Sequence, residues 1–455
     1  MSTVIRGGRV IDPAQGIDEL TDIAFADGQV VALGRSPGEY DEEIDAEGLA
    51  VTPGFIDLHC HLREPGQEHK ETIASGTLAA ARGGFTTVCA MPNTTPVIDS
   101  RSLVESVLAS ARASASIRVL PIGAVTRGSA GHELAELGDM AAAGAVAFSD
   151  DGQPVWDAGL MRRALEYSRA LGLLIIDHCE EPALSKGGVM HEGWVSVRLG
   201  LPGAPAAAEE AAVARDLQLA ELTGARVHIA HVSTAGSVEL LRTARARGVE
   251  FSTEVTPHHL TLTHEAVMGG AKAAGEALAY DTNARVNPPL RGDQDVAACV
   301  AGLVEGVIDC IATDHAPHAS EDKVCEFEQA ANGISGLETA FGLCHDLVTA
   351  GHLTLPVLIE RLTAAPARVF GLERFVPGIG TLREGAPADV ALIAPEESWS
   401  VDPGAMASKG KNTPLAGRTL TGRVVMTMSG GRIVHDSRSP AAEGARQAAG
   451  GRRGR

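Results

Sequence analysis

The middle of the chain repeats short apolar runs that end in polar residues, each followed by a stretch of helical composition. This alternation is typical of βα units, whose parallel strands are buried on both faces and therefore read as almost continuous apolar segments. Eight runs are present, at residues 54–61, 85–93, 117–125, 145–151, 173–178, 227–231, 251–259 and 308–315. Eight strands close a (β/α)8 barrel, so we expect an α/β fold with a TIM barrel over residues 54–375.

The two ends of the chain have a different pattern, of short alternating strands punctuated by glycine. Segments of this kind fill residues 1–53 and return in residues 376–436, and both Gly7–Val10 and Gly430–Val434 have a G-G-R hairpin signal. We therefore expect both ends to form one small β-sandwich domain. Residues 437–455 hold five arginines and one glutamate without periodicity, which predicts a disordered basic tail.

Composition narrows the function classes. Hydrophobic residues make up 44% of the chain but aromatic residues only 3%, which predicts a core of small aliphatic side chains. The net charge of −20 argues against nucleic-acid binding. No apolar run is long enough to span a membrane, and the start of the sequence lacks the apolar core of a secretory signal. The seven cysteines form no C-x-x-C pair, so we expect a cytoplasmic protein with reduced thiols.

Candidate metal ligands follow several of the predicted strands, at the ends where barrel enzymes place their active sites. His59 and His61 are two residues apart in one strand, so both side chains should face the barrel interior. A lone H-x-H pair is weak evidence. Other strands, however, end in further candidates, and a purely structural explanation would require five independent coincidences. These further candidates are Asp151, His178, His231 and Asp314.

Six side chains are too many for one tetrahedral zinc ion but suit two ions that share a carboxylate. We expect His59, His61 and Asp314 to bind one ion, and His178 and His231 to bind the other. Asp151 is the better bridging ligand, because Asp150 would face the opposite side of the strand. Imidazole and carboxylate ligands together favour zinc, with cobalt or manganese as substitutes.

Distinctive motifs surround these candidates. They are G-F-I-D-L-H-C-H-L-R-E-P-G-Q (54–67), A-M-P-N-T-T-P (90–96), F-S-D-D-G (148–152), D-H-C-E (177–180), A-H-V-S (230–233), E-V-T-P-H-H-L (254–260), N-P-P-L-R (287–291) and A-T-D-H-A-P-H (312–318). With them, the chain resembles bacterial class I dihydroorotases of the cyclic amidohydrolase superfamily from about residue 3 to residue 436. The resemblance implies reversible cyclisation of N-carbamoyl-L-aspartate to L-dihydroorotate, the third step of de novo pyrimidine (UMP) biosynthesis.

The resemblance also implies a mechanism with two zinc ions bridged by Asp151 and a hydroxide. In the hydrolytic direction this hydroxide would attack the ring amide carbonyl while zinc polarises its oxygen. Asp314 would be the catalytic acid and base that passes a proton to the leaving nitrogen.

The substrate bears a carboxylate, so the site needs positioned hydrogen-bond donors. Arg63 lies two residues after His61 on the same strand face, where its guanidinium can form a bidentate pair with a carboxylate. The resemblance also assigns substrate contacts to His61, Asn93, Asn287 and His318. Asn283 is an unlikely substitute for Asn287.

One segment departs from the family pattern. The family commonly has Pro-Phe-Gly before a G-x-E-T-A segment, whereas this chain has A-A-N-G-I-S-G-L-E-T-A, with Asn332 and Gly333 at the substrate-contacting pair. A main-chain contact is expected to survive this change, but an aromatic wall is not.

Three further histidines lie in or after predicted strands. His258 and His259 follow Pro257 at a strand end, so one of them could support a metal ligand or the substrate. Strand alternation places His228 on the opposite side from His231.

Two alternative functions remain. Hydantoinases and allantoinases share the barrel and the H-x-H pair, but their metals are bridged by a carboxylated lysine on the fourth strand, and residues 140–150 contain no lysine. They also lack an arginine at the place of Arg63. A noncatalytic scaffold for aspartate carbamoyltransferase would have lost metal ligands, whereas all six candidates are present; an active enzyme in complex with aspartate carbamoyltransferase stays open, and a homo-oligomer is expected.

Overall fold

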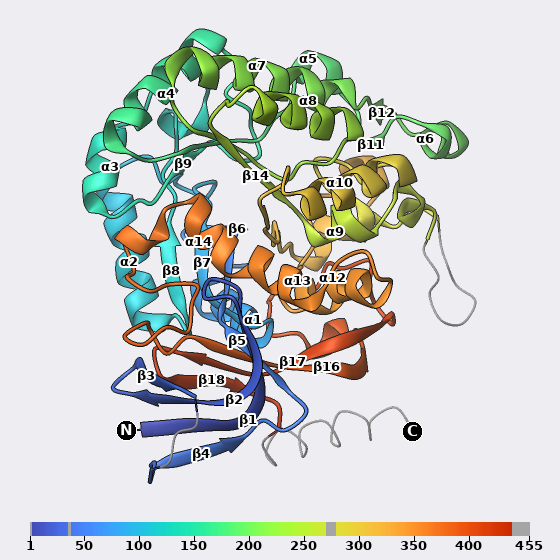
Figure 1. Cartoon of the computed structure of the whole chain (residues 1–455). Coiled ribbons are helices and arrows are strands. Elements are labelled where there is room, and N and C mark those ends of the chain that lie inside the picture. The colour runs from blue at the N-terminus through green and yellow to red at the C-terminus, as the bar shows by residue number, and fades with distance from the viewer. Residues whose placement is uncertain (1, 35–37, 270–278, 439–455) are drawn as a thin grey trace.

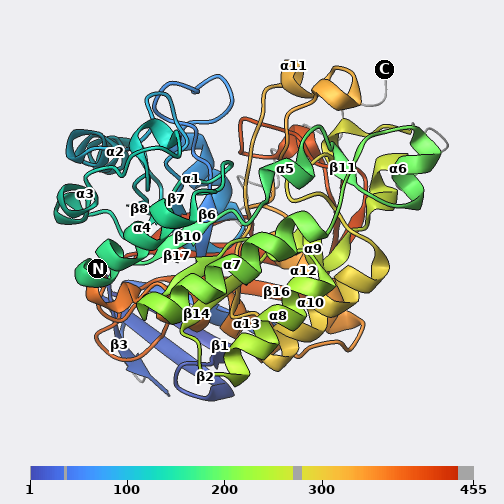
Figure 2. The ribbon, with the colours of Figure 1, turned by 90° about the horizontal axis from the view of Figure 1, so that it is seen from above.

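The centre of the molecule is a closed barrel of parallel strands (Figure 1, Figure 2). The computed structural model describes residues 2–34, 38–269 and 279–438. Within these residues eight strands pair in chain order, and isolated bridges from Gly123 to Phe148 and from Cys60 to His315 close the ring. Each strand lies within one of the eight apolar runs, which confirms the predicted barrel. The strands are β6 (Phe55–Cys60), β7 (Phe85–Ala90), β8 (Arg118–Pro121), β9 (Phe148–Ser149), β10 (Ile175–Asp177), β13 (Val227–Ile229), β14 (Phe251–Val255) and β15 (Cys310–Ile311).

Helices cover the outside of the barrel, and their apolar side chains share one buried cluster with the outward-facing residues of the strands. Local signals set the helix ends: at α4, Asp157 accepts a hydrogen bond from the Leu160 N–H (2.8 Å), and Gly172 ends the helix with a φ of 64°. The helices of this layer are α1 (Ile73–Arg82), α2 (Arg101–Ser114), α3 (Leu137–Ala143), α4 (Ala158–Leu171), α7 (Ala207–Thr223), α8 (Ala235–Ala246), α10 (Asp293–Glu305), α12 (Ala340–Thr349) and α13 (Leu355–Leu362).

Aliphatic side chains fill the inside of the barrel. Ile56, Leu58, Ile122 and Ile176 belong to one buried cluster, which Phe370 and residues of α14 (Ala364–Val369) complete. Because this interior is packed, the carboxyl ends of the strands and the loops that follow them are left for a site.

Short elements in these loops rim the carboxyl end of the barrel. After β10 the chain forms α5 (Pro182–Ser185), a two-stranded ribbon and α6 (Trp194–Leu199), which extends away from the barrel in Figure 1. The ribbon consists of β11 (Met190–His191) and β12 (Gly203–Ala204). Other short helices of these loops are η1 (Arg127–Ser129), α9 (Pro257–Thr261), η2 (His264–Met268), η3 (Thr282–Ala284), α11 (Ser320–Lys323) and η4 (Phe327–Gln329). In contrast, η5 (Leu372–Arg374) follows α14, and Arg374 donates to the Gly172 carbonyl (2.7 Å) before β10.

Strands from both chain ends form one further sheet, which lies beside the barrel in Figure 1. The two ends meet where β16 pairs with β5 in antiparallel register, and the sheet branches at β1, which pairs with β2, β4 and β5. Ile5, Val51, Leu392 and Met426 contribute to its own buried core. The strands are β1 (Ser2–Asp12), β2 (Ile17–Ala26), β3 (Gln29–Leu33), β4 (Glu42–Asp45), β5 (Ala50–Pro53), β16 (Val390–Ser400), β17 (Thr419–Ser429) and β18 (Arg432–Asp436).

The two G-G-R segments have different conformations. Gly430 and Gly431 form the two-residue turn between β17 and β18, with φ of 55° and 79°, as a tight hairpin requires. The expected hairpin at Gly7 is wrong: Gly7 and Gly8 lie within the continuous strand β1, at an irregularity in its pairing with β2. A Cβ at Gly8 would lie 2.4 Å from a methyl group of Val51, so close packing explains this glycine.

The predicted basic tail lies outside the described residues from residue 439 onward. In the part of the chain that is described, none of the helices combines the length and apolar character that crossing a bilayer would require.

Candidate metal centre

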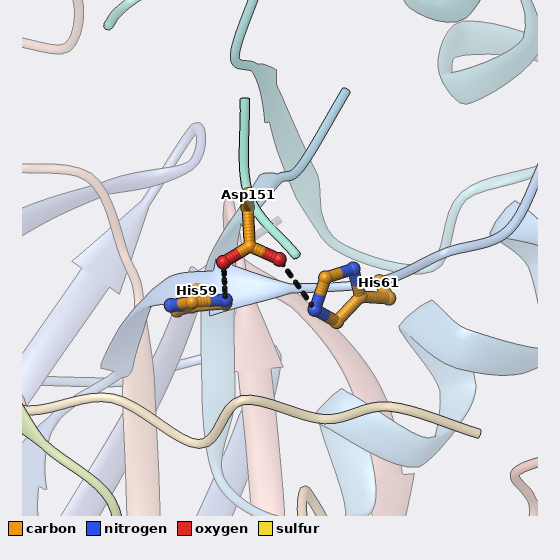
Figure 3. Close-up of side chains that lie close together, drawn as sticks. All are labelled: His59, His61 and Asp151. Carbon is orange, nitrogen blue, oxygen red and sulfur yellow. Dashed lines mark ion pairs between the residues drawn. The ribbon is translucent and has the colours of Figure 1, made fainter. Parts of the chain in front are cut away.

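The six candidate ligands converge at the carboxyl end of the barrel. Figure 3 shows His59 on β6 and His61 just after the end of this strand, with the Asp151 carboxylate between them. Asp151 Oδ1 lies 3.3 Å from His59 Nε2, and Asp151 Oδ2 lies 3.4 Å from His61 Nε2. On the other side, Asp151 Oδ1 lies 3.9 Å from His178 Nδ1 and 3.8 Å from His231 Nε2. This carboxylate therefore stands between two histidine pairs.

The two aspartates around this centre are held differently from their neighbour Asp150. Asp314 Oδ1 lies 3.0 Å from His61 Nε2 and 3.5 Å from His59 Nε2. Asp150 instead accepts hydrogen bonds from the backbone N–H groups of residues 125 (2.9 Å) and 126 (3.0 Å), which fixes it to the preceding loop. The structure brings Asp151 and Asp314, but not Asp150, against the histidines.

A chain irregularity aims His59 and His61 into the site. Between Asp57 and Cys60 three residues of β6 advance against two of β7, which is the pattern of a β-bulge. At the ends of two other strands, His231 and Asp314 have left-handed φ angles of 33° and 44°. Such angles are unfavourable for residues other than glycine and are found at functional sites, where the surrounding structure enforces them.

The donor atoms fit a bound cation. His59 Nε2 and Asp151 Oδ1 are buried and have no hydrogen-bond partner among the residues that the structure describes, although buried polar groups are normally satisfied. Burial disfavours a charge on His59, but Asp151 and Glu254 outweigh it and raise the pKa of His59 well above its ordinary value. Both observations indicate a place that favours positive charge, and imidazole with carboxylate is a donor set for zinc and related metals.

Asp314 is ionised in this surrounding. Burial alone would raise its pKa, but the positive charge at His59 and the hydrogen bond with His61 hold the pKa of Asp314 well below its usual range. At neutral pH the group is therefore a carboxylate that can accept a proton.

Two glutamates that the sequence analysis did not single out orient the histidines. Glu254 Oε1 accepts a hydrogen bond from His59 Nδ1 (2.6 Å), which leaves His59 Nε2 for a metal. Glu180 Oε2 accepts one from His178 Nε2 (2.9 Å) and leaves His178 Nδ1 facing the centre. Despite burial, these imidazoles lower the pKa of both carboxylates to about 2. A signal was present: Glu254 interrupts the apolar strand F-S-T-E-V, and Glu180 ends D-H-C-E.

His228 was placed wrongly by strand alternation. Its Nε2 lies 3.2 Å from Glu254 Oε2, so His228 reaches the same carboxylate that orients His59. The left-handed backbone at His231 interrupts the two-residue period and allows both histidines to serve one side of the strand.

The histidines after β14 support the neighbouring loop. His259 Nδ1 lies 2.8 Å from Thr256 Oγ1, and its Nε2 donates to the Pro288 carbonyl (3.0 Å), next to Asn287. His258 is buried, and its Nε2 has no hydrogen-bond partner in the described segments.

A pocket of about 180 Å³ opens beside the candidate ligands. Every residue assigned to substrate binding lines it, together with five of the six candidate ligands, whereas His59 lies beneath. Asn283 is not part of this lining; its backbone N–H instead donates to Asp281. The lining residues are His61, Arg63, Asn93, Asp151, Gly152, His178, His231, Asn287, Asp314, Ala316, His318, Asn332 and Gly333.

One wall of the pocket is basic. Arg63 is 8% exposed, has a left-handed φ of 60° and donates through Nε to the Pro317 carbonyl (3.2 Å). Its Nη2 lies 3.4 Å from His318 Nε2. Burial, followed by the charges of Arg63 and Lys70, lowers the pKa of His318 to about 3, so this imidazole is neutral. A guanidinium beside a neutral imidazole can receive an anionic group.

Two amides link the pocket to the candidate ligands. Asn93 Oδ1 accepts a hydrogen bond from His61 Nδ1 (2.9 Å), and Asn93 Nδ2 donates to the Asp151 carbonyl (3.2 Å). Asn287 Nδ2 donates to Glu180 Oε2 (2.8 Å). A molecule bound in the pocket would therefore lie against groups that also fix the histidines.

Comparisons with known proteins agree with this geometry. A family model described as Dihydro-orotase-like matches residues 48–237. The chain is 54% identical over 440 residues to the dihydroorotase of Pelotomaculum thermopropionicum, covering 96% of this chain and 99% of that protein. It is 53% identical over 434 residues to the dihydroorotase of Anaeromyxobacter dehalogenans strain 2CP-C, covering 95% and 97%.

Solved structures share the fold. The L-hydantoinase (dihydropyrimidinase) from Arthrobacter aurescens superposes with a TM-score of 0.83 at 26% identity, covering 95% of this chain and 96% of that chain. The dihydropyrimidinase from Brevibacillus agri NCHU1002 superposes with a TM-score of 0.81 at 24% identity, covering 96% and 95%, and this likeness concerns the fold alone.

Proposed function

Because the chain belongs to the dihydroorotase family, we propose that it catalyses the reversible cyclisation of N-carbamoyl-L-aspartate to L-dihydroorotate in pyrimidine biosynthesis. The observation that carries this proposal at residue level is the position of Arg63. Its guanidinium lines the same pocket as the histidine and aspartate cluster, where a carboxylate-bearing substrate needs a positive charge. Hydantoin lacks such a carboxylate, so this arginine favours dihydroorotate over hydantoin.

We assign the cluster to two zinc ions. His59, His61 and Asp314 would hold one ion and the remaining two histidines the other, with Asp151 shared between them, as its contacts to both histidine pairs support. When bound, the metal would supply a nucleophile from water at neutral pH and Lewis-acid polarisation of the amide carbonyl. The donor atoms without hydrogen-bond partners, His59 Nε2 and Asp151 Oδ1, support this assignment.

Asp314 is the proposed catalytic acid and base. Its carboxylate is ionised, lies at the candidate metal ligands and lines the pocket, so it can take a proton from the nucleophile and give it to the ring nitrogen when the amide bond breaks. In the cyclisation direction the same group removes a proton from the ureido nitrogen as that nitrogen attacks the side-chain carboxyl carbon, and it gives the proton to the carboxyl oxygen that leaves as water when the C–O bond breaks. Asp314 therefore serves both directions.

The remaining pocket residues orient the substrate. Arg63 and His318 would bind its carboxylate, while Asn93, Asn287 and the backbone of Gly333 offer hydrogen-bonding groups around the ring. Because Asn93 also holds His61, substrate orientation and the histidine cluster are mechanically connected.

The decisive experiment is ultraviolet-monitored hydrolysis of dihydroorotate by the purified, zinc-loaded protein, with hydantoin and allantoin as controls and metal content measured on the same sample. We expect selective turnover of dihydroorotate with about two zinc ions per chain. Turnover of hydantoin instead would support the hydantoinase alternative. Absence of both turnover and metal would contradict the proposal and favour the noncatalytic scaffold.

Some expectations remain predictions from the sequence. These are the homo-oligomer, the cytoplasmic location and the complex with aspartate carbamoyltransferase. Absence of turnover in a zinc-loaded sample, restored by adding aspartate carbamoyltransferase, would support the complex.

A further inference from the structure

The long connection between β16 and β17 leaves the small sheet and contacts the segments that form one wall of the pocket. We name residues 403–415 of this connection the strap; it begins with η6 (Pro403–Ala405). Residues far apart in sequence meet here, because the strap belongs to the last fifth of the chain and contacts loops of the barrel.

Two glutamates, the buried Glu71 and the partly buried Glu338, attach the strap to the barrel. Glu71 accepts hydrogen bonds from Ser408 Oγ (2.6 Å) and the Lys409 N–H (3.2 Å). Glu338 accepts from the N–H groups of Ala407 (2.9 Å) and Ser408 (3.2 Å). Hydrogen bonds to charged groups are among the stronger ones in proteins, so these contacts hold the strap in one place.

Close packing then brings the strap against the pocket wall. A Cβ at Gly410 would lie 2.5 Å from Pro317 Cβ and 2.7 Å from the His318 nitrogen. This distance is too short for any side chain, so the glycine permits direct contact between the strap and the loop after β15.

Asn412 occupies the point of contact, is 4% exposed and uses its whole hydrogen-bonding capacity. Its Oδ1 accepts from the His318 N–H (2.8 Å) and from the Ser335 O–H (3.0 Å), which is shared with the Gly410 carbonyl (2.9 Å). Its Nδ2 donates to the carbonyls of Ala316 (3.0 Å) and Gly333 (2.9 Å). An amide side chain offers two donors and two acceptor sites, and here all four are engaged.

Three of these partners, Ala316, His318 and Gly333, line the pocket. Gly333 has a φ of 146°, and a Cβ there would lie 2.5 Å from the Ala316 carbonyl oxygen, so the two segments touch backbone to backbone. Asn412 bridges both segments across this contact. The described contacts of the candidate metal ligands run instead to Asn93, Glu180 and Glu254.

We propose that Asn412 is a positioning residue for substrate binding: it holds the His318 and Gly333 segments at the spacing that the substrate carboxylate and ring require. This inference rests on the proposed function only for the identity of the substrate. Asn412 acts through the pocket wall and touches neither the substrate nor the candidate metal ligands.

Steady-state kinetics with metal analysis test the proposal. Asn412→Ala should raise the KM for dihydroorotate about 10- to 100-fold, while kcat changes by less than about fivefold and zinc per chain stays unchanged. Asn412→Asp should behave similarly, because a carboxylate cannot donate to the two carbonyls. Thr413→Val is the matched control: Thr413 lies in the strap and is buried, but within the described part of the chain its Oγ1 accepts only from the Leu415 N–H (3.2 Å), so KM should stay as in the wild type.

Backbone hydrogen exchange gives a readout that does not depend on the substrate. In Asn412→Ala, amides of residues 315–336 should exchange at least about tenfold faster than in the wild type, with the rest of the barrel unchanged. If this variant does not fold, Ser335→Ala, which removes one donor to Asn412, should raise KM about two- to fivefold.

The outcomes separate the two proposals. An unchanged KM with unchanged exchange in Asn412→Ala would overturn the positioning role, as would a loss of zinc with KM unaltered. If the wild type does not act on dihydroorotate, the proposed function fails, while faster exchange confined to residues 315–336 would still support the role of Asn412 in holding the wall.

Discussion

Two buried clusters of metal-ligating residue types lie back to back around β10. The first is the candidate metal centre, to which His178 contributes. The second consists of Asp177, Cys179 and Asp216, whose ligand atoms also lie within 4.8 Å of one another. Strand alternation sends His178 towards the barrel axis and its two neighbours outward against α7. Both clusters therefore bring side chains that can bind a metal close together, and closeness alone does not distinguish them.

The two clusters differ in whether their buried polar atoms have partners, and in the second cluster they do. Arg215 Nη2 lies 3.1 Å from Asp177 Oδ2 and 2.7 Å from Asp216 Oδ1, and Val155 N–H donates to Asp177 Oδ1 (3.1 Å). The Cys179 thiol donates to Asp216 Oδ2 (3.4 Å). Burial and the neighbouring Asp177 raise the pKa of Asp216 well above its ordinary value.

In the first cluster His59 Nε2 and Asp151 Oδ1 lie 3.3 Å apart as an ion pair, but neither atom has a hydrogen-bond partner among the described residues, and the cluster opens into a pocket. A buried polar atom without a partner is costly, and a metal ion relieves that cost. Unpaired donors beside a pocket thus distinguish a metal site from an ion-pair network of similar composition. Variants in the two clusters can test this distinction.

The largest effect is expected for Asp314→Asn. An amide cannot accept the proton, so kcat for dihydroorotate should fall by about 1,000-fold or more. Steady-state kinetics measure this effect. Turnover close to the wild type would contradict the assigned role.

Asp151→Asn should remove the shared ligand of the first cluster. We expect zinc per chain to fall and kcat to drop by at least about 100-fold, because a neutral amide does not balance two cations. Atomic absorption on the purified protein measures the metal. Asp216→Asn in the second cluster is the control, and this variant should bind as much zinc per chain as the wild type. Loss of zinc in the Asp216 variant would remove the contrast between the clusters.

Arg63→Ala should weaken substrate binding. Losing hydrogen bonds to a carboxylate costs about 1.5–3 kcal/mol, so KM should rise about 10- to 150-fold with a smaller change in kcat. Kinetics with dihydroorotate measure the rise. A KM within twofold of the wild type would mean that another group receives the carboxylate.

Arg215→Met should act on stability rather than on metal. Breaking a fully buried ion pair costs about 3–5 kcal/mol, and we expect about 2 kcal/mol here because the Arg215 side chain is 21% exposed. Urea unfolding measures this loss, and zinc per chain should not change. A variant that keeps its stability but loses zinc would reverse the roles of the two clusters.

The smallest effect is a pH dependence from Asp216. Its pKa is raised in the folded protein by burial and Asp177, so its contribution to stability is complete below about pH 4 and is lost as pH rises through the folded-state pKa. Asp216→Asn should therefore show a flatter decline of the unfolding free energy above about pH 4 than the wild type. Equal slopes would show that the pKa of Asp216 is not raised in the folded state.

Much of the site could be predicted because its parts have local signals. Each of the eight strands is an apolar run, and parallel strands bring their carboxyl ends to one rim. His59, His178 and Asp314 could be placed together for this reason, without any knowledge of their distances. The expectation for His228 failed because a left-handed residue, His231, interrupts the strand period, and single-residue φ angles leave no mark in the hydrophobic pattern.

The sequence by itself determined the strand order, the rim and the residue types gathered there, since these follow from local periodicity and from the geometry of a closed barrel. Only the tertiary structure decided that Glu254 orients His59, that Arg215 pairs with Asp177 in the second cluster and that Asn412 holds the pocket wall. Each of these is a pairing between distant segments. Hydrogen bonds and ion pairs depend on ångström-scale distances after packing, and the order of residues along a chain does not specify such distances.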